Sequence, residues 1–199
     1  SRAKQHQAEL SMKAADWVRL DLRRHYAQTV IGGIHVNALH GRKDFEAIEQ
    51  ELDKCAEYGV QQVARTYLSP VHRPGVPEDE RRKKMEMAVD MFGAHPGLRA
   101  YWLADEPGVA EAEAFYQGKK VMESLDPNHP CLCTCNSVDA IEEYAPTMQI
   151  TSIDQYFIGR VPDRDEGAWA IVDSVRYARE LGADRIWLIA HAFEMSGWR

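Results

Sequence analysis

Residues 98–108 (LRAYWLADEPG) place two acidic side chains directly after an apolar segment. The apolar part is typical of a short strand that is covered on both faces, as parallel strands are. Pro107 cannot donate a hydrogen bond to a neighbouring strand, so we expect the strand to end by Glu106. The residues after it have the spacing of an amphipathic helix. The segment therefore predicts a parallel strand with Asp105 and Glu106 at its carboxyl end, where α/β folds build their sites.

Short apolar segments and longer amphipathic segments alternate along the rest of the chain. The six expected strands cover residues 30–38, 60–68, 98–104, 131–135, 148–154 and 185–193, and the expected helices cover 5–27, 45–58, 78–92, 109–125, 138–144 and 168–181. Repeated βα units indicate parallel strands joined by right-handed crossovers. We therefore expect a single α/β domain over residues 1–199, either an open doubly wound sheet or an eight-fold β/α barrel with parts missing.

Composition and motifs exclude several classes of function. The chain of 199 residues has a formal net charge of −7 and no basic face, so we expect no nucleic-acid partner. No apolar segment reaches the roughly 20 residues of a membrane span, and no signal peptide is visible near the N-terminus. We expect a soluble protein and leave its compartment open. Because neither a G-x-G-x-x-G motif nor a P-loop is present, we expect no cofactor.

Three cysteines, Cys131, Cys133 and Cys135, alternate along one expected strand. Their side chains therefore point to the same face, where they are poorly placed to form disulfides with one another. A metal site would be supported by a CxxC pair or a histidine cluster, and neither accompanies them. We expect buried thiols that behave as small apolar side chains, and no metal.

Polar, acidic and aromatic residues gather at the carboxyl ends of the expected strands. They are His35, Asn37, His40, Arg65, Tyr67, Asp105, Glu106, Asn136, Asp154, Gln155, Tyr156, His191 and Glu194. A parallel barrel would bring them to one mouth. Hydrolysis of a glycosidic bond needs one protonated carboxyl as acid and a second carboxylate as nucleophile or base. Glu106 is the natural acid, and Asp154 and Glu194 are candidates for the second role.

Several segments resemble the β/α-barrel glycoside hydrolases of the clan-A type, especially the relatives that carry Asp-Glu-Pro. Residues 101–107 (YWLADEP) resemble the end of their fourth strand, and residues 153–159 (IDQYFIG) resemble the turn after their sixth. The segments that resemble the approaches to strands four and five and the seventh strand are His95-Pro96, 126–130 (DPNHP) and 187–193 (WLIAHAF).

The resemblance spans roughly residues 45–198 and implies a TIM-type barrel in which the six visible strands are strands two to seven. It implies that Glu106 is the acid/base residue and that Tyr156 lines the sugar site. Asp105 stands where the best-known members have an asparagine that contacts the sugar 2-hydroxyl. The other substrate-binding candidates at the mouth are His35, Asn37, Arg65, Tyr67, Asn136 and His191.

The sequence departs from that family in two ways. The seventh strand should end in a nucleophilic glutamate, but it runs through Ala190 and His191, and Glu194 lies further along. A complete barrel is about 250 residues long, so strands one and eight are missing from this one. We therefore expect a fragment, a split gene product, or a barrel completed by another chain or by a homo-oligomer.

Three hypotheses remain open. The first is a glycoside hydrolase that acts on an oligo- or polysaccharide through Glu106. The second is a non-catalytic carbohydrate-binding or degenerate barrel, because the glutamate of strand seven is absent. The third is a metal-dependent isomerase or hydrolase that uses His35, Glu106, Asp154 and His191, since oxygen and imidazole ligands suit a divalent ion.

Overall fold

The computed structural model describes residues 29–31, 42–66, 68–69, 75–156 and 164–189. Its strands are β1 (Thr29–Ile31), β2 (Gln61–Arg65), β3 (Leu98–Asp105), β4 (Cys131–Cys135), β5 (Ile150–Ile153) and β6 (Ile186–Leu188). Its helices are α3 (Arg42–Glu57), α4 (Glu78–Phe92), α5 (Ala112–Leu125), α6 (Val138–Tyr144) and α7 (Arg164–Glu180), with 3₁₀ turns at Val109–Glu111 and Ala145–Thr147. Among these described residues, no helix is both long enough and apolar enough to cross a membrane.

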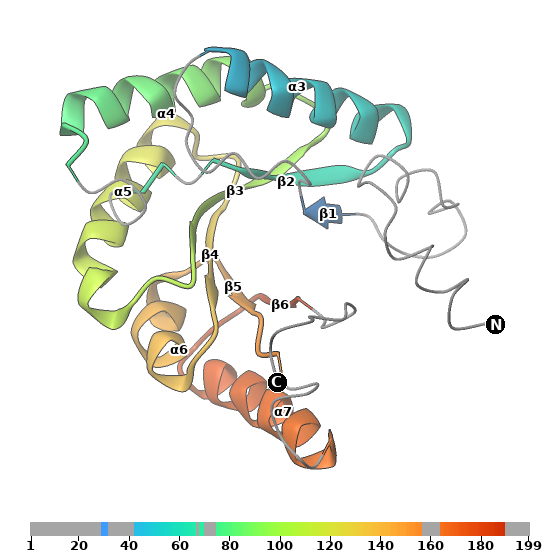
Figure 1. Cartoon of the computed structure of the whole chain (residues 1–199), viewed down its shortest axis with the longest axis vertical. Helices are drawn as coiled ribbons and strands as arrows, with labels where there is room; N and C mark the ends of the chain where they lie inside the picture. Colours follow the sequence, from blue (N-terminus) through green and yellow to red (C-terminus); the bar gives the residue numbers. More distant parts are fainter. Residues whose placement is uncertain (1–28, 32–41, 67, 70–74, 157–163, 190–199) are drawn as a thin grey trace, which may run out of the picture.

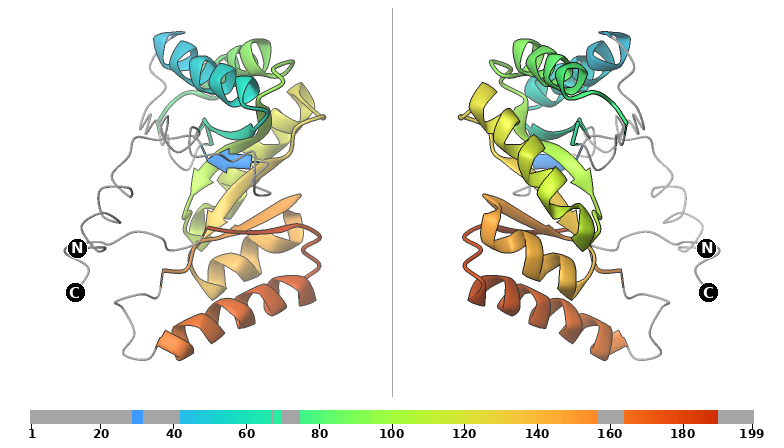
Figure 2. Two further views of the ribbon diagram at one scale, coloured as in Figure 1. Left: turned by 90° about the vertical axis from the view of Figure 1, so that its right-hand side faces the viewer. Right: turned by 90° about the vertical axis from the view of Figure 1, so that its left-hand side faces the viewer.

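The strands form one parallel sheet in which each strand pairs with its neighbour in the sequence, in the order β1-β2-β3-β4-β5-β6. The sheet curls, and helices α3 to α7 all lie along its convex side (Figure 1; Figure 2). A doubly wound sheet would carry helices on both faces. The described part of the chain is therefore an α/β fold that forms a curled, incomplete barrel.

The long strand β3 lies at the centre of the core. Its residues from Ala100 to Ala104 are buried, and only Arg99 within the strand is exposed. Helices α3, α4 and α5 cover the sheet with apolar side chains, and Phe45 of α3 stacks on Phe92 of α4 with ring centroids 6.0 Å apart. The predicted apolar stretch is thus confirmed as a strand that is buried over most of its length.

Some elements end elsewhere than the sequence predicts. Strand β2 stops at Arg65 because the Thr66 N–H turns back to the Ala64 carbonyl (3.0 Å) and the Thr66 hydroxyl donates to the Trp102 carbonyl. Strands β5 and β6 are shorter than expected, and α7 already begins at Arg164, inside a stretch expected to be loop. The predicted helix over 5–27, and the predicted strand residues 32–38 and 190–193, lie outside the described residues.

All four cysteines of the sequence are free and buried. Cys131, Cys133 and Cys135 point to the helix side of β4, where the Cys135 thiol lies 3.8 Å from the Ala140 carbonyl oxygen of α6. Burial is the main cause that raises the pKa of Cys133 well above its ordinary value. The expectation of buried thiols is confirmed.

A buried polar cluster ties α5 to β3 and β4 at the amino end of the strands. Asp126 is 4% exposed and accepts hydrogen bonds from the Tyr101 hydroxyl (2.9 Å), the Asn128 backbone N–H (3.0 Å) and His129 Nδ1 (2.8 Å). Burial acts to raise the pKa of Asp126, but these hydrogen bonds outweigh it and leave the pKa below its ordinary value. A buried carboxylate satisfied in this way fixes the turn between α5 and β4.

Candidate active site

Glu106 follows β3 directly and has a left-handed backbone, with a φ of 47°. It is the one non-glycine residue with positive φ in the described part of the chain. Such a conformation costs an L-residue about 1–3 kcal/mol and recurs at functional sites, where the surroundings hold it in place. Here the Glu106 N–H donates to the Thr134 carbonyl of β4 (3.0 Å), while the Glu106 side chain is exposed. The turn therefore presents a carboxyl group at the carboxyl end of the central strand.

Two further hydrogen bonds fix the loop after Glu106. The Gly108 N–H donates to Glu111 Oε2 (2.6 Å), and the Tyr144 hydroxyl of α6 donates to the Gly108 carbonyl (2.8 Å). Pro107, which is buried and lies between Glu106 and Gly108, further restricts the backbone. The loop is thus held from both α5 and α6.

The strand register places a polar row on the inner, concave side of the sheet. Asp105 pairs with Thr134, and Thr134 pairs with Ser152. Register partners in a parallel sheet point to the same side, so these three side chains share a face. Cys135 points the other way, toward α6. The polar row therefore lies opposite the helices and leads to the carboxyl ends of β3 and β5.

Asp154 lies beside Glu106 at the end of β5. It is 3% exposed, and its carboxyl forms a hydrogen bond with the carboxyl of Glu106. Burial first, then the negative charge of Glu106, this hydrogen bond and the charge of Asp105 raise the pKa of Asp154 to about 8, although a hydrogen bond from Tyr156 acts in the opposite direction. Asp154 is therefore mostly protonated at neutral pH.

The side chains of residues 154–156 point alternately to the inner side and the helix side of the sheet. Gln155 Oε1 accepts a hydrogen bond from the Ser174 hydroxyl of α7 (2.8 Å), so Gln155 points to the helix side. Asp154 and Tyr156 then lie on the inner side, in agreement with the contact between them. Burial and the charge of Asp154 raise the pKa of the Tyr156 phenol, which stays a proton donor.

Two buried oxygens of this site have no hydrogen-bond partner among the residues that the structure describes. They are Asp154 Oδ1 and Thr134 Oγ1. Buried polar atoms normally have a hydrogen-bond partner, and an unpaired one can mark a functional site. The inner end of the polar row thus retains hydrogen-bonding capacity.

Arg65 brings a positive charge to the same end of the sheet. Its guanidinium lies over the Trp102 ring, 4.6 Å from the centroid, and Arg65 Nη2 lies 3.9 Å from Asp105 Oδ2. The Arg65 side chain is 12% exposed, which a charged group tolerates only with partners of this kind. One of the three carboxyls is therefore balanced by an ion pair, whereas Asp154 and Glu106 contact each other.

The structure brings together five of the predicted site residues: Arg65, Asp105, Glu106, Asp154 and Tyr156. Asn136 follows β4 and is exposed. The remaining predicted site residues, His35, Asn37, His40, Tyr67, His191 and Glu194, lie outside the described part of the chain. Within that part, no group of three histidine, cysteine or acidic side chains is placed to hold a metal ion.

Sequence reasoning missed Trp102 and Thr134 as parts of this site. Trp102 was predicted only as a strand residue, and its stacking on Arg65 depends on the register of β2 against β3. Thr134 gives a weak signal, because its hydroxyl interrupts an otherwise thiol-bearing and apolar strand.

No protein-family model matches the chain, and no curated protein matches it. Solved structures with a similar fold include the β-D-glucuronidase of Dictyoglomus thermophilum, with 17% identity and a TM-score of 0.57 over 75% of this chain and 29% of that one. They also include a GH2 β-galacturonidase of Eisenbergiella tayi bound to galacturonate, with 17% identity and a TM-score of 0.61 over 89% of this chain and 31% of that one. The chain thus spans less than a third of the length of each of these two enzymes, and the likeness at this identity is one of fold.

Proposed function

We propose that the chain carries the acid/base half of a glycoside hydrolase site, with Glu106 as the general acid that protonates the leaving oxygen of an oligo- or polysaccharide. The observation that carries this proposal is the left-handed Glu106 at the end of β3, with its exposed carboxyl against a buried acid. Both solved structures described above are glycosidases, which favours the same class of reaction.

The rest of the proposed fold is a TIM-type barrel of the clan-A kind. A sheet whose helices cover only its convex side is the arrangement of such a barrel. The strands that would close it belong to residues outside the described part, to another chain or to a second copy. The mouth of that barrel would face the polar row of Asp105, Thr134 and Ser152.

The second carboxylate of the reaction is the open part of the mechanism. Retaining and inverting hydrolases hold their two carboxyls about 5–5.5 Å and 6.5–9.5 Å apart. The hydrogen bond between the carboxyls of Glu106 and Asp154 puts them in direct contact, closer than either of these separations. We therefore propose Asp105 or Glu194 for the second role, and a different role for Asp154.

Hydrolysis of aryl β-glycosides tests the proposed function, with glucuronide, galacturonide, galactoside and glucoside as substrates. Glu106→Gln should lower kcat/KM about 10²–10⁴-fold, the usual contribution of a general acid. A substrate with a more acidic leaving phenol should recover part of that loss, because such a phenol leaves without protonation. The matched control is Glu57→Gln, which removes an exposed carboxyl before the amino end of β2. Equal rates for the two variants would contradict the role of Glu106.

Carbohydrate binding without turnover is the second candidate function. It is favoured by the sequence of the expected seventh strand, which runs through Ala190 and His191 where the clan-A glycoside hydrolases have a nucleophilic glutamate. Calorimetric titration with oligosaccharides that are not hydrolysed would distinguish the two functions. Binding that is equal in the wild type and in Glu106→Gln, with no product formed, would support the binding function.

A further inference from the structure

We propose that Asp154 is a positioning residue that donates a hydrogen bond from its protonated carboxyl to the carboxyl of Glu106 and so holds that side chain over the inner face of the sheet. The inference deepens the proposed function and rests on it for the role of Glu106. It differs from the usual arrangement of two acids on either side of a sugar, because here one acid acts through the other.

The backbone of the two strands places these side chains next to each other. Glu106 is bonded to Thr134 of β4 through its N–H, and the Asp154 N–H donates to the Cys135 carbonyl of the same strand (3.3 Å). Both residues are therefore fixed to consecutive residues of β4, one from each side. The hydrogen bond of Gln155 to Ser174 then holds Asp154 and Tyr156 on the inner side.

Burial keeps the carboxyl of Asp154 protonated. Asp154 is 3% exposed, whereas the Glu106 side chain is exposed to solvent. A charge is much more costly in the buried position, so Asp154 keeps its proton as a hydrogen-bond donor, and Glu106 is the acid that gives a proton to the leaving oxygen. Among the described residues, the groups that act on Asp154 are Glu106, Asp105 and Tyr156, and Arg65 pairs with Asp105.

The hydrogen bond from Asp154 orients a side chain that would otherwise be mobile. An exposed glutamate side chain has several rotamers, and fixing one of them costs conformational entropy. The hydrogen bond from the Asp154 carboxyl offsets that cost. The Asp154 carboxyl therefore selects one orientation of Glu106, and ionisation of Asp154 at higher pH replaces the bond with repulsion between two carboxylates.

The experiment is a pH titration of the full chain labelled with ¹³C at the aspartate carboxyls, followed by NMR. We expect one aspartate signal with a midpoint of about 8, absent in Asp154→Asn and at least about one pH unit lower in Glu106→Gln. The control is Asp173→Asn, which removes a carboxyl that is 71% exposed and should leave that signal unchanged. A wild type in which all aspartates titrate below about pH 5, or a signal unaffected by Glu106→Gln, would overturn the inference.

The rate of hydrolysis distinguishes a positioning role from a purely structural one. Asp154→Asn keeps a donor toward Glu106 and should retain most of kcat, whereas Asp154→Ala should lose about tenfold or more in kcat. The decline of kcat above pH 8 in the wild type should disappear in Asp154→Asn. Titration near pH 8 without any hydrolysis would sustain the acid pair and reject the proposed function. Hydrolysis that depends on Glu106, in a chain in which no aspartate titrates near pH 8, would support the proposed function and reject the role of Asp154.

Discussion

The backbone N–H of Glu106 donates a 3.0 Å hydrogen bond to the carbonyl oxygen of Thr134 on the neighbouring strand. A strand that simply ended would leave this N–H free to turn to solvent. Instead β4 holds the left-handed turn, and the conformational cost of that turn is balanced by the packing of the sheet around it.

Replacement of Glu106 should reveal the backbone strain separately from the chemistry. We expect Glu106→Gly to be about 1 kcal/mol more stable than Glu106→Ala. A left-handed conformation costs alanine about 1–2 kcal/mol, which exceeds the extra unfolded-state entropy of glycine, roughly 0.5–1 kcal/mol. Urea unfolding of both variants measures the difference, and both should lack hydrolytic activity.

The control for that pair lies in the middle of α5. Gln117 is an exposed helical residue, so Gln117→Gly should be less stable than Gln117→Ala, by about 0.8–1 kcal/mol. The same order at both positions would show that Glu106 is not strained.

The pH dependence of stability should carry the signature of Asp154. Its folded-state pKa of about 8 lies above its ordinary value of 3.8, so the folded chain binds the proton more tightly than the unfolded chain. The free energy of unfolding should therefore decrease as the pH rises from about 4 to about 8, by at most ~1.4 kcal/mol per pH unit for this one group.

Denaturant midpoints measured across that range, for the wild type and Asp154→Asn, provide the measurement. Asp154→Asn should show a smaller decrease, because an amide does not ionise. Parallel curves for the two proteins would mean that Asp154 titrates alike in the folded and the unfolded chain.

Tyr144→Phe should loosen the loop that carries Glu106. Its hydroxyl donates to the Gly108 carbonyl at 2.8 Å, and loss of such a bond costs about 0.5–1.5 kcal/mol. We expect a modest loss of stability and a larger proportional loss of kcat, because the loop positions the acid. Tyr116→Phe, on the half-buried side of α5, is the control, and an equal effect on kcat would argue against a specific role of Tyr144.

Asp126→Asn should destabilise the chain without affecting the site. The carboxylate of Asp126 has three bonded donors, and weakening a buried, satisfied network of this kind costs about 1–3 kcal/mol. Unfolding by urea measures the loss, and kcat at a temperature where the variant is folded should match the wild type. A lower kcat in the folded variant would show that the two ends of the strands are coupled.

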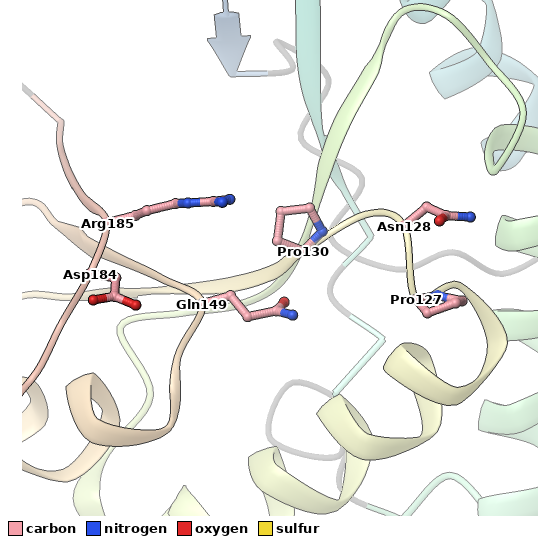
Figure 3. Close-up of a pocket in the computed structure, with 6 residues that line it drawn as sticks. All are labelled: Pro127, Asn128, Pro130, Gln149, Asp184 and Arg185. Carbon is pink, nitrogen blue, oxygen red and sulfur yellow. The ribbon is translucent and has the colours of Figure 1, made fainter.

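A surface pocket lies at the amino end of the strands and is separate from the candidate active site. It has a volume of about 320 Å³ and is lined by Pro127, Asn128, Pro130, Gln149, Asp184 and Arg185 (Figure 3). These residues precede β4, β5 and β6, whereas Glu106 and Asp154 follow β3 and β5. In parallel α/β folds the amino ends of the strands serve stability more often than chemistry, which agrees with the cluster around Asp126 nearby.

The sequence predicts much of the fold because local patterns determine it. The apolar run before Asp105 predicts the central strand, and the apolar stripe that contains Phe45 predicts α3. The end of β2 is different, since Thr66 turns the chain through bonds to Ala64 and Trp102 that no local pattern encodes.

The candidate site is predictable only in part, for the same reason. That Asp105 and Glu106 lie at a strand end follows from Pro107 alone. The contact between Glu106 and Asp154 depends on the order of three strands, and the left-handed backbone of Glu106 depends on its bond to Thr134. Relations across the sheet of this kind are set by tertiary structure.

The reactivity of the buried thiols can be used to measure local unfolding of the protein. Burial raises the pKa of Cys55 to about 11, and it also raises the pKa of Cys131 and Cys133, so reactive thiolate is scarce in the folded chain. A thiol reagent reacts with thiolate, and it reaches these sulfurs only when helices separate from the sheet. The rate of alkylation therefore measures how often the native structure opens. Substitutions at the carboxyl ends of the strands can be compared for their effect on this opening without any added label.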